Sequence, residues 1–402
     1  MTPDQLTELS RLLYSPTTIV LYIVAAFVYL YALTTTVGRR DERRRGRKAQ
    51  TVGGILAIAG VGAHIAHEIT RGIAQDRLPL GNMFEVSSLM ALVGVAGGLI
   101  YLQFIRKRAE LNGFVLLGGA LILGLAMLMY SEPGPLMPIL DTWWRPFHVS
   151  LLVSAMGIFS AAFVFMGLYL LRDTAERSLA KAPPGGSSVG AAYVGDVGLD
   201  AREEGIEEAG SQRVPATRGP DDEDSDIEHL RAAEHRAALR AGVPVLKLAL
   251  GVFVGTSTVS WVFWQNTGWG VDGLTRFLTV NLVMVAVALL ARWFVPFLPA
   301  KETLDGLAHR TVAFAFIMWT VGTIAGAMWA EVSWGRFWGW DPKETGAFLT
   351  WIVYAGYLHA RATRGMRGRR AAWIGIGAFV VLWATYLIAN YVIVGLHSYA
   401  DL

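Results

Sequence analysis

The sequence predicts an all-α, polytopic integral membrane protein of about ten transmembrane helices, interrupted by a long disordered cytoplasmic linker. Of its 402 residues, 53% are hydrophobic and only 17% are charged, and the mean hydropathy is +0.42. A soluble domain of this length carries more charge. The chain has no cysteine, which excludes disulfides, thiolate catalysis and cysteine metal sites.

Ten apolar segments approach the ~20 residues that a helix needs to cross a bilayer. The basic cluster follows the first segment and no small-residue cleavage site is present, so we interpret this segment as an anchor rather than a signal peptide. The sixth segment contains polar residues and the ninth is short. The predicted spans are 17–37, 51–70, 83–105, 112–131, 148–171, 244–265, 277–297, 309–330, 346–361 and 371–395.

The distribution of lysine and arginine predicts the orientation. The loops 38–50, 105–111, 298–310 and 361–370 hold 17 basic residues, whereas the N-terminal tail and the alternate loops hold seven. Basic loops stay in the cytoplasm, so both termini are expected on the outer side. Since topology accounts for the basic residues, we expect no binding of nucleic acid.

Residues 173–242 interrupt the membrane pattern with acidic and small residues, as in "EEGIEEAGSQ" and "DDEDSDIEHL". Such a segment buries too little apolar surface to order its backbone, so it is predicted to be a disordered cytoplasmic linker. The linker separates an N-terminal five-helix region, 1–172, from a C-terminal five-helix region, 243–402. Its His229 and His235 are interpreted as solvated side chains rather than metal ligands.

A tryptophan-dense stretch, "WAEVSWGRFWGWDPKETGAF", occupies residues 329–348 and places four tryptophans within twelve residues. The simplest interpretation is an aromatic belt at the membrane surface. That interpretation does not predict glycines between the tryptophans, followed at once by Asp-Pro-Lys-Glu. Indole faces suit a flat apolar ligand such as a porphyrin.

Topology sorts the histidines of the predicted membrane region. His148 and His397 are expected at the outer end, in the same layer as the tryptophan-dense stretch, and neutral imidazole is an axial ligand of haem iron. His359 and His309 are expected at the inner end, and His64 and His67 share one face of the second span. A single histidine at a helix end is also typical of an interfacial hydrogen-bonding group, and this alternative stays open for His359.

One resemblance is specific. "WGRFWGWDPKE", residues 334–344, matches the signature W-G-x-x-W-x-W-D-x-[RK]-E of the CcsA/CcmC/CcmF haem-handling family of cytochrome c maturation. "TWIVYAGYLHAR" and the ending "NYVIVGLHSYA" resemble the CcsA branch, also called CcsB or ResC, and "LPLGNMFEVSSL", residues 78–89, is similar to that branch's N-terminal segment. The acidic linker and the spans within 244–297 look like an insertion relative to this family.

The resemblance implies a haem conduit of the system II type in the bacterial plasma membrane. Haem b, the transported substrate, is taken from the inner side and presented outside to the CxxCH motif of apocytochrome c. His148 and His397 are implied as axial ligands of the outer haem iron, and His359 as an iron ligand at an inner site. The loop residues implied to bind haem are Trp334, Gly335, Trp338, Trp340, Asp341, Lys343 and Glu344.

The family also implies partners. A ResB-type (CcsB-like) membrane protein usually completes the cytochrome c synthase, or haem lyase, and thioredoxin-like proteins act indirectly by keeping the thiols of apocytochrome c reduced. No residue is identified as a catalytic acid or base, because Asp341 and Glu344 are equally well interpreted as a cap of the ninth span. Two alternatives remain open: a transporter or channel without haem chemistry, and an assembly factor that recruits apocytochrome.

Overall fold

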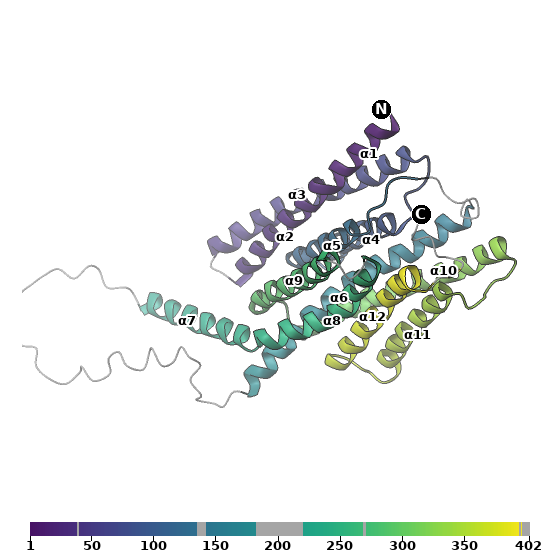
Figure 1. The fold of residues 1–402 in the computed structure, drawn as a ribbon. Helices are drawn as coiled ribbons and strands as arrows, with labels where there is room; N and C mark the ends of the chain where they lie inside the picture. Colours follow the sequence, from purple (N-terminus) through teal and green to yellow (C-terminus); the bar gives the residue numbers. More distant parts are fainter. Residues whose placement is uncertain (38–39, 135–141, 182–219, 268–270, 394, 396–402) are drawn as a thin grey trace, which may run out of the picture.

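The computed structural model describes the chain except residues 38–39, 135–141, 182–219, 268–270, 394 and 396–402, and the regular structure of the described part is entirely helical (Figure 1). The α-helices are α1 (Pro3–Leu12), α2 (Ile19–Thr34), α3 (Arg40–Ala74), α4 (Met83–Ile100), α5 (Asn112–Met127), α6 (Trp144–Lys181), α7 (Pro220–Ala241), α8 (Val245–Thr267), α9 (Val271–Trp293), α10 (Lys301–Trp334), α11 (Pro342–Thr363) and α12 (Arg369–Tyr391). Shorter helical turns are η1 (Leu13–Thr18), η2 (Thr35–Val37), η3 (Tyr101–Ile105), η4 (Ala109–Leu111) and η7 (Val295–Phe297).

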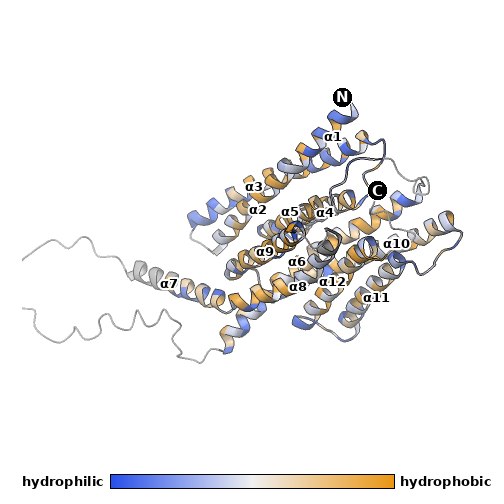
Figure 2. Cartoon of the chain, viewed as in Figure 1, coloured by the Kyte–Doolittle hydropathy of each residue, from blue (hydrophilic) through white to orange (hydrophobic). Residues whose placement is uncertain are grey.

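Most of the helices are formed largely by hydrophobic residues, as the hydropathy colouring in Figure 2 shows. Eight of the described helical segments are long and apolar enough to cross a membrane, or nine if the bent pair Leu230–Ala241 and Val245–Ser257 is one span. Large apolar side chains such as Ile58, Phe314 and Ile317 are exposed on the bundle. Such surfaces are unfavourable in water and favourable in lipid. These findings confirm an all-α, multi-pass membrane protein.

Each of the ten predicted spans overlaps a helix, but two of them are not among the eight apolar segments. The predicted sixth span corresponds to α8, which enters the count only through the bent pair. The predicted ninth span corresponds to α11, whose sequence mixes apolar residues with Thr, Tyr, His and Arg.

The ends of the predicted disordered linker differ from expectation, because α6 continues to Lys181 and α7 covers Pro220–Ala241. The last turns of α6 are held by ion pairs four residues apart, Arg172 to Glu176 at 2.7 Å and Arg177 to Asp173 at 2.8 Å. Such pairs stabilise exposed helix. The centre of the predicted linker, 182–219, lies outside the described residues.

The long helix α6 is the centre of the bundle and packs against α10, α4 and α12. Its Gly157 lies so close to Gly94 of α4 that a Cβ on Gly94 would lie 2.8 Å from the Gly157 carbonyl oxygen. Small residues permit this backbone approach in membrane proteins. Further along α6, the Phe159 ring stacks on Tyr354 of α11 with centroids 3.8 Å apart. The first turns of α6 and the end of α10 lie at the same end of the bundle (Figure 1).

Candidate functional site

His148 lies in the second turn of α6, and its ring rests on the backbone of α10. The Nδ1–H donates to the carbonyl oxygen of Gly322 at 2.7 Å, across 174 positions of sequence. Because a carbonyl only accepts, this bond selects the tautomer in which Nε2 carries the lone pair. A metal-bound histidine usually donates its other ring N–H in this way. The structure therefore places a hydrogen on Nδ1, so that Nε2 is the ring nitrogen left to coordinate a metal.

A second glycine of α10 makes room for the ring. An added Cβ at Gly326 would lie 2.6 Å from His148 Nδ1 and 3.2 Å from Nε2, well inside ordinary contact. Gly322 and Gly326 therefore form a seat for the imidazole on α10, one turn apart. The seat depends on two helices that are far apart in the chain, so no local sequence pattern could have predicted it.

Aromatic rings continue from His148 toward the tryptophan-dense loop. Trp329 lies 6.0 Å from His148 between ring centroids, and Trp334 lies 5.2 Å from Trp329. Trp338 and Trp340 belong to a second group, 5.8 Å from each other and packed edge-on against Phe348 of α11. The structure thus divides the three predicted platform tryptophans into two groups, and it adds Trp329, which the sequence motif does not include.

The loop between α10 and α11 has a defined backbone. α10 is capped by Gly335, which has φ +67° in the left-handed region and whose N–H donates to the Glu331 carbonyl. Trp340 also has a positive φ, +58°, and its side chain is exposed. A positive φ in a bulky residue is strained and typical of functional loops. The backbone therefore holds the Trp340 indole on the surface of this end of the bundle.

Asp341 and Glu344 form a capping box at the start of α11. Asp341 Oδ1 accepts from the Lys343 N–H at 3.1 Å, while Glu344 Oε2 accepts from the Asp341 N–H at 3.2 Å and the Gly339 N–H at 2.7 Å. A capping box satisfies backbone donors that a helix start leaves unpaired. Both carboxylates therefore have a structural role, since they fix the loop onto α11.

Two cations lie within this loop. Burial lowers the pKa of the Lys343 ammonium to about 8, and the charge of Asp341 opposes this shift. The Arg336 guanidinium lies against Gly339, 4.0 Å from Glu344 Oε2, and its Nη1 has no hydrogen-bond partner among the described residues. A buried guanidinium nitrogen that lacks a partner is suited to an anionic ligand group. The donor set at this end therefore fits a carboxylate-bearing ligand such as haem.

The predicted second outer ligand, His397, lies outside the described residues. The nearest described part of its segment is Gly395, where an added Cβ would lie 2.5 Å from Asp341 Oδ2 and 2.8 Å from Pro342 Cδ. The chain after α12 therefore approaches the capping box of α11, two positions before His397.

His359 occupies the other end of α11, and its side chain is exposed rather than turned into the bundle. Its neighbour Arg361 is bound by Asp305 of α10 through two bonds of 2.8 Å. The histidine that faces α11 from the bundle at this end is His309 of α10, whose ring lies 6.2 Å from Tyr357. The structure does not bring His359 together with His148.

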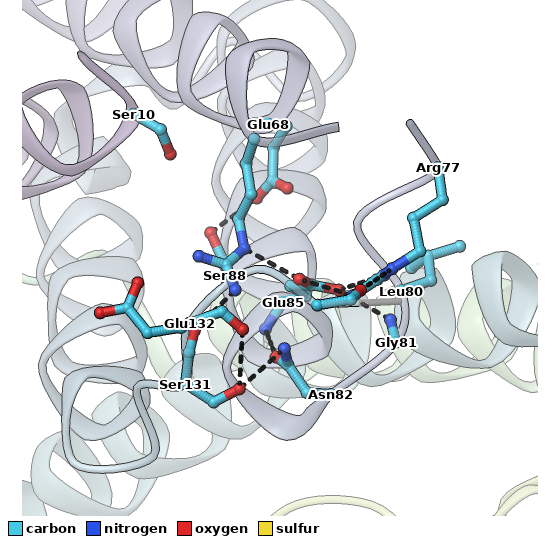
Figure 3. Close-up of polar contacts among 12 residues, drawn as sticks. Ser10, Glu68, Arg77, Leu80, Gly81, Asn82, Glu85, Ser88, Ser131 and Glu132 are labelled. Carbon is cyan, nitrogen blue, oxygen red and sulfur yellow. Dashed lines mark hydrogen bonds and ion pairs between the residues drawn. The ribbon is translucent and has the colours of Figure 1, made fainter. Parts of the chain in front are cut away.

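The segment "LPLGNMFEVSSL" contributes an ion cluster that no sequence motif predicted. Glu85 of α4 is fully buried and binds Arg71 at 2.9 Å, Arg77 at 2.8 Å and the Gly81 N–H at 2.7 Å (Figure 3). The cluster fixes the α3–α4 loop, and the carbonyl of Leu80 in that loop accepts a 3.0 Å bond from Arg145. Arg145 is buried and precedes His148 by one turn of α6, so this cluster supports the start of the helix that carries His148.

Comparison with known proteins shows the family of this chain. A family model described as cytochrome c assembly protein matches residues 80–397. A cytochrome c biogenesis protein CcsA of Gloeobacter violaceus is 28% identical over 404 residues, covering 99% of this chain and 98% of that protein.

Shorter alignments are closer in sequence. CcsA of Microcystis aeruginosa is 44% identical over 144 residues, 36% of this chain and 42% of that protein, and CcsA of Guillardia theta is 53% identical over 98 residues, 24% of this chain and 33% of that protein. In these two alignments the chain spans less than half the length of the relatives. The family model, by contrast, covers well over half of the chain. The chain belongs to the cytochrome c assembly protein family, and its role lies in cytochrome c biogenesis.

Proposed function

We propose that the protein carries haem b across the bacterial plasma membrane and presents it, at the end of the bundle that holds His148, for attachment to apocytochrome c. The observation that carries this proposal is the seat of His148 on α10. There the Nδ1–H bond to Gly322 leaves the lone pair on Nε2. The Trp329 indole lies next to the His148 imidazole, and the Trp334 indole lies next to Trp329. Imidazole and indole together suit the iron and the face of a porphyrin.

The loop residues supply the remaining contacts. Arg336 and Lys343 are the cations that would meet the haem propionates, and Trp338 and Trp340 shield the open side of the ring. His397 is proposed as the second axial ligand, because its segment approaches the start of α11 at Gly395. Asp341, Glu344 and Gly335 act through the shape of the loop.

In this proposal the chain holds and orients the substrate. Attachment joins each thiol of the CxxCH motif to a vinyl carbon of haem, so the thiol proton ends on the neighbouring vinyl carbon. Holding the vinyl groups beside the incoming thiols converts an encounter into a reaction within one complex. We propose a ResB-type membrane protein as the partner, with thioredoxin-like proteins keeping the thiols reduced.

His359 is proposed as a ligand of a separate inner haem. Its exposure on α11 favours an arrangement in which a helix of the ResB-type partner covers it and supplies the other ligand. The distance supports separate sites: 18 residues from Asp341 to His359 span ~27 Å of helix, close to the ~30 Å thickness of the hydrocarbon layer.

The test is the absorption spectrum of the complex purified with its partner. Wild-type protein is expected to show a Soret band with the features of two imidazole ligands, and His148→Ala is expected to lose the outer haem and to regain part of it with added imidazole. His235→Ala changes an exposed histidine of α7 and serves as the matched control. Wild-type haem content and normal cytochrome c formation in His148→Ala would contradict the proposal.

A further inference from the structure

A chain of four polar side chains is buried between α2, α3 and α4, apart from the candidate haem site. Tyr22, His64 and Ser88 have no exposed surface, and Glu68 is 8% exposed. The helices that carry them are among the apolar segments long enough to cross the membrane. Ionisable side chains inside such segments are costly, and they typically mark proton or ion pathways.

The hydrogen bonds among these four side chains all run in one direction. The Ser88 hydroxyl donates to Glu68 Oε1 at 2.6 Å, so its oxygen accepts from His64 Nε2–H at 3.0 Å. His64 then has its lone pair on Nδ1, which accepts from the Tyr22 hydroxyl at 3.1 Å. Tyr22, His64 and Ser88 thus form a relay that ends on the Glu68 carboxylate.

The Glu68 carboxylate can accept one more hydrogen bond. Its Oε2 is buried and has no hydrogen-bond partner among the described residues. His64 Nε2 lies 3.6 Å from Oε1. The adjacent His67 donates from Nδ1 to the Ser10 carbonyl at 2.9 Å, and its Nε2 is also without a partner in the described part of the chain.

The charges around Glu68 come from each helix that packs there. Arg71 is bound by Glu85, which also binds Arg77, so this trio carries one excess positive charge. Glu68 is three residues before Arg71 on α3, and a carboxylate there has the opposite sign. The other groups that face Glu68 are neutral in this hydrogen-bond pattern. They are His64 and His67 of α3, Tyr14 of η1, Tyr22 of α2, Ser10 of α1 and Ser88 of α4.

We propose that Glu68 is an exchangeable proton-binding site within the membrane region, served by Ser88, His64 and Tyr22. A proton that reaches the Tyr22 oxygen releases the hydroxyl proton of Tyr22 to His64 Nδ1. His64 then gives its Nε2 proton to the Ser88 oxygen, and Ser88 gives its hydroxyl proton to Glu68 Oε1. Afterwards Oε1–H donates to Ser88, the Ser88 hydroxyl donates to Nε2, and Nδ1–H donates to the Tyr22 oxygen. One proton enters, one new O–H bond is present at Glu68, and each of the three hydrogen bonds is kept with its direction reversed.

The ability to keep every bond distinguishes this chain from a static polar network. A network that only rigidifies the core needs one fixed set of donors and acceptors. Here a serine hydroxyl and a histidine, which each have two equivalent arrangements, separate the carboxylate from the tyrosine. Such a chain takes up and releases a proton while the three hydrogen bonds among its members are kept.

Infrared difference spectroscopy of the full-length protein in lipid nanodiscs tests the proposal. Lowering the pH is expected to produce the C=O stretch of a buried protonated carboxylic acid, with the shift on deuteration that marks an exchangeable proton. Glu68→Gln is expected to remove this band. Glu8→Gln, which changes an exposed glutamate of α1, is the matched control and is expected to keep it.

Ser88→Ala provides a second variant that keeps the carboxylate. It removes the donor to Oε1, so the Glu68 band is expected to move in frequency and to appear at a different pH. This variant also decides the matter if Glu68→Gln does not fold. A wild-type protein without such a band, a band that persists in Glu68→Gln, or one that Ser88→Ala leaves unmoved would each overturn the proposal. None of these readouts depends on haem.

Discussion

Replacing Gly326 by alanine tests the seat of His148 more sharply than removing the histidine itself. The new Cβ would lie 2.6 Å from Nδ1, whereas ordinary contacts begin at 3.4 Å. The Cε1 atom of the ring lies closer still to this Cβ, so the imidazole must move by ~1 Å to reach a normal van der Waals separation. Such a displacement stretches the 2.7 Å bond to Gly322 and turns Nε2 away from its direction in the native seat.

The energies separate function from stability. Alanine is favoured over glycine inside a helix by ~1 kcal/mol. The weakened hydrogen bond costs ~1 kcal/mol. Crowding of the imidazole adds a cost of ~1–3 kcal/mol, so Gly326→Ala is expected to fold with a somewhat lower stability than the wild type. A misplacement of ~1 Å in a reacting complex costs on the order of 100-fold in rate.

The chain offers a matched control on the same helix. Gly306 of α10 has open space where its Cβ would lie, so Gly306→Ala gains the helix preference without touching a neighbour. The assay compares thermal denaturation in detergent, the haem spectrum and the yield of c-type cytochromes. Gly326→Ala is expected to remain folded and to lose most cytochrome c formation, while Gly306→Ala keeps both its stability and cytochrome c formation. Equal cytochrome yield and equal haem spectra in the two variants would refute the seat as the site of iron binding.

The geometry and the sequence support four further predictions. His359→Ala is expected to lower the haem that reaches the outer site while the remaining haem keeps its bis-imidazole spectrum; unchanged haem content and cytochrome yield would leave His359 as an interface residue. Because Lys343 has a pKa of about 8, its ammonium loses its charge as the pH rises through that value. Haem retention is therefore expected to fall near this pH in the wild type and to stay level in Lys343→Arg. The same pH dependence of haem retention in both proteins would remove Lys343 from the site. Deletion of residues 185–225 is expected to leave cytochrome c formation near normal, and loss of all c-type cytochromes with the protein still present would indicate a docking role for this segment. A reporter that is active only in the cytoplasm is expected to be silent when fused after Leu402, and activity there would contradict an outer C-terminus.

The class of protein, most of the helices and the identity of the loop were all predictable from the amino-acid sequence. Apolar segments of membrane-spanning length and the spacing of tryptophan, glycine and aspartate are local properties, so they can be recognised without a fold. The capping box of Asp341 and Glu344 was also foreseeable, because a helix start is decided by neighbours within four residues.

What each helix faces depends instead on the packed bundle. The rotation of a helix about its own axis is set by the partners that pack against it, and in a membrane hydrophobicity does not separate the inside from the lipid side. This is why the seat of His148 on Gly322 and Gly326 was not visible in the sequence, and why His359 turned out to be exposed. The same reason applies to Glu85 and Glu68, whose charges are tolerated because their partners come from other parts of the chain. Burial of a charge requires partners at fixed distances, and those distances exist only in the tertiary structure.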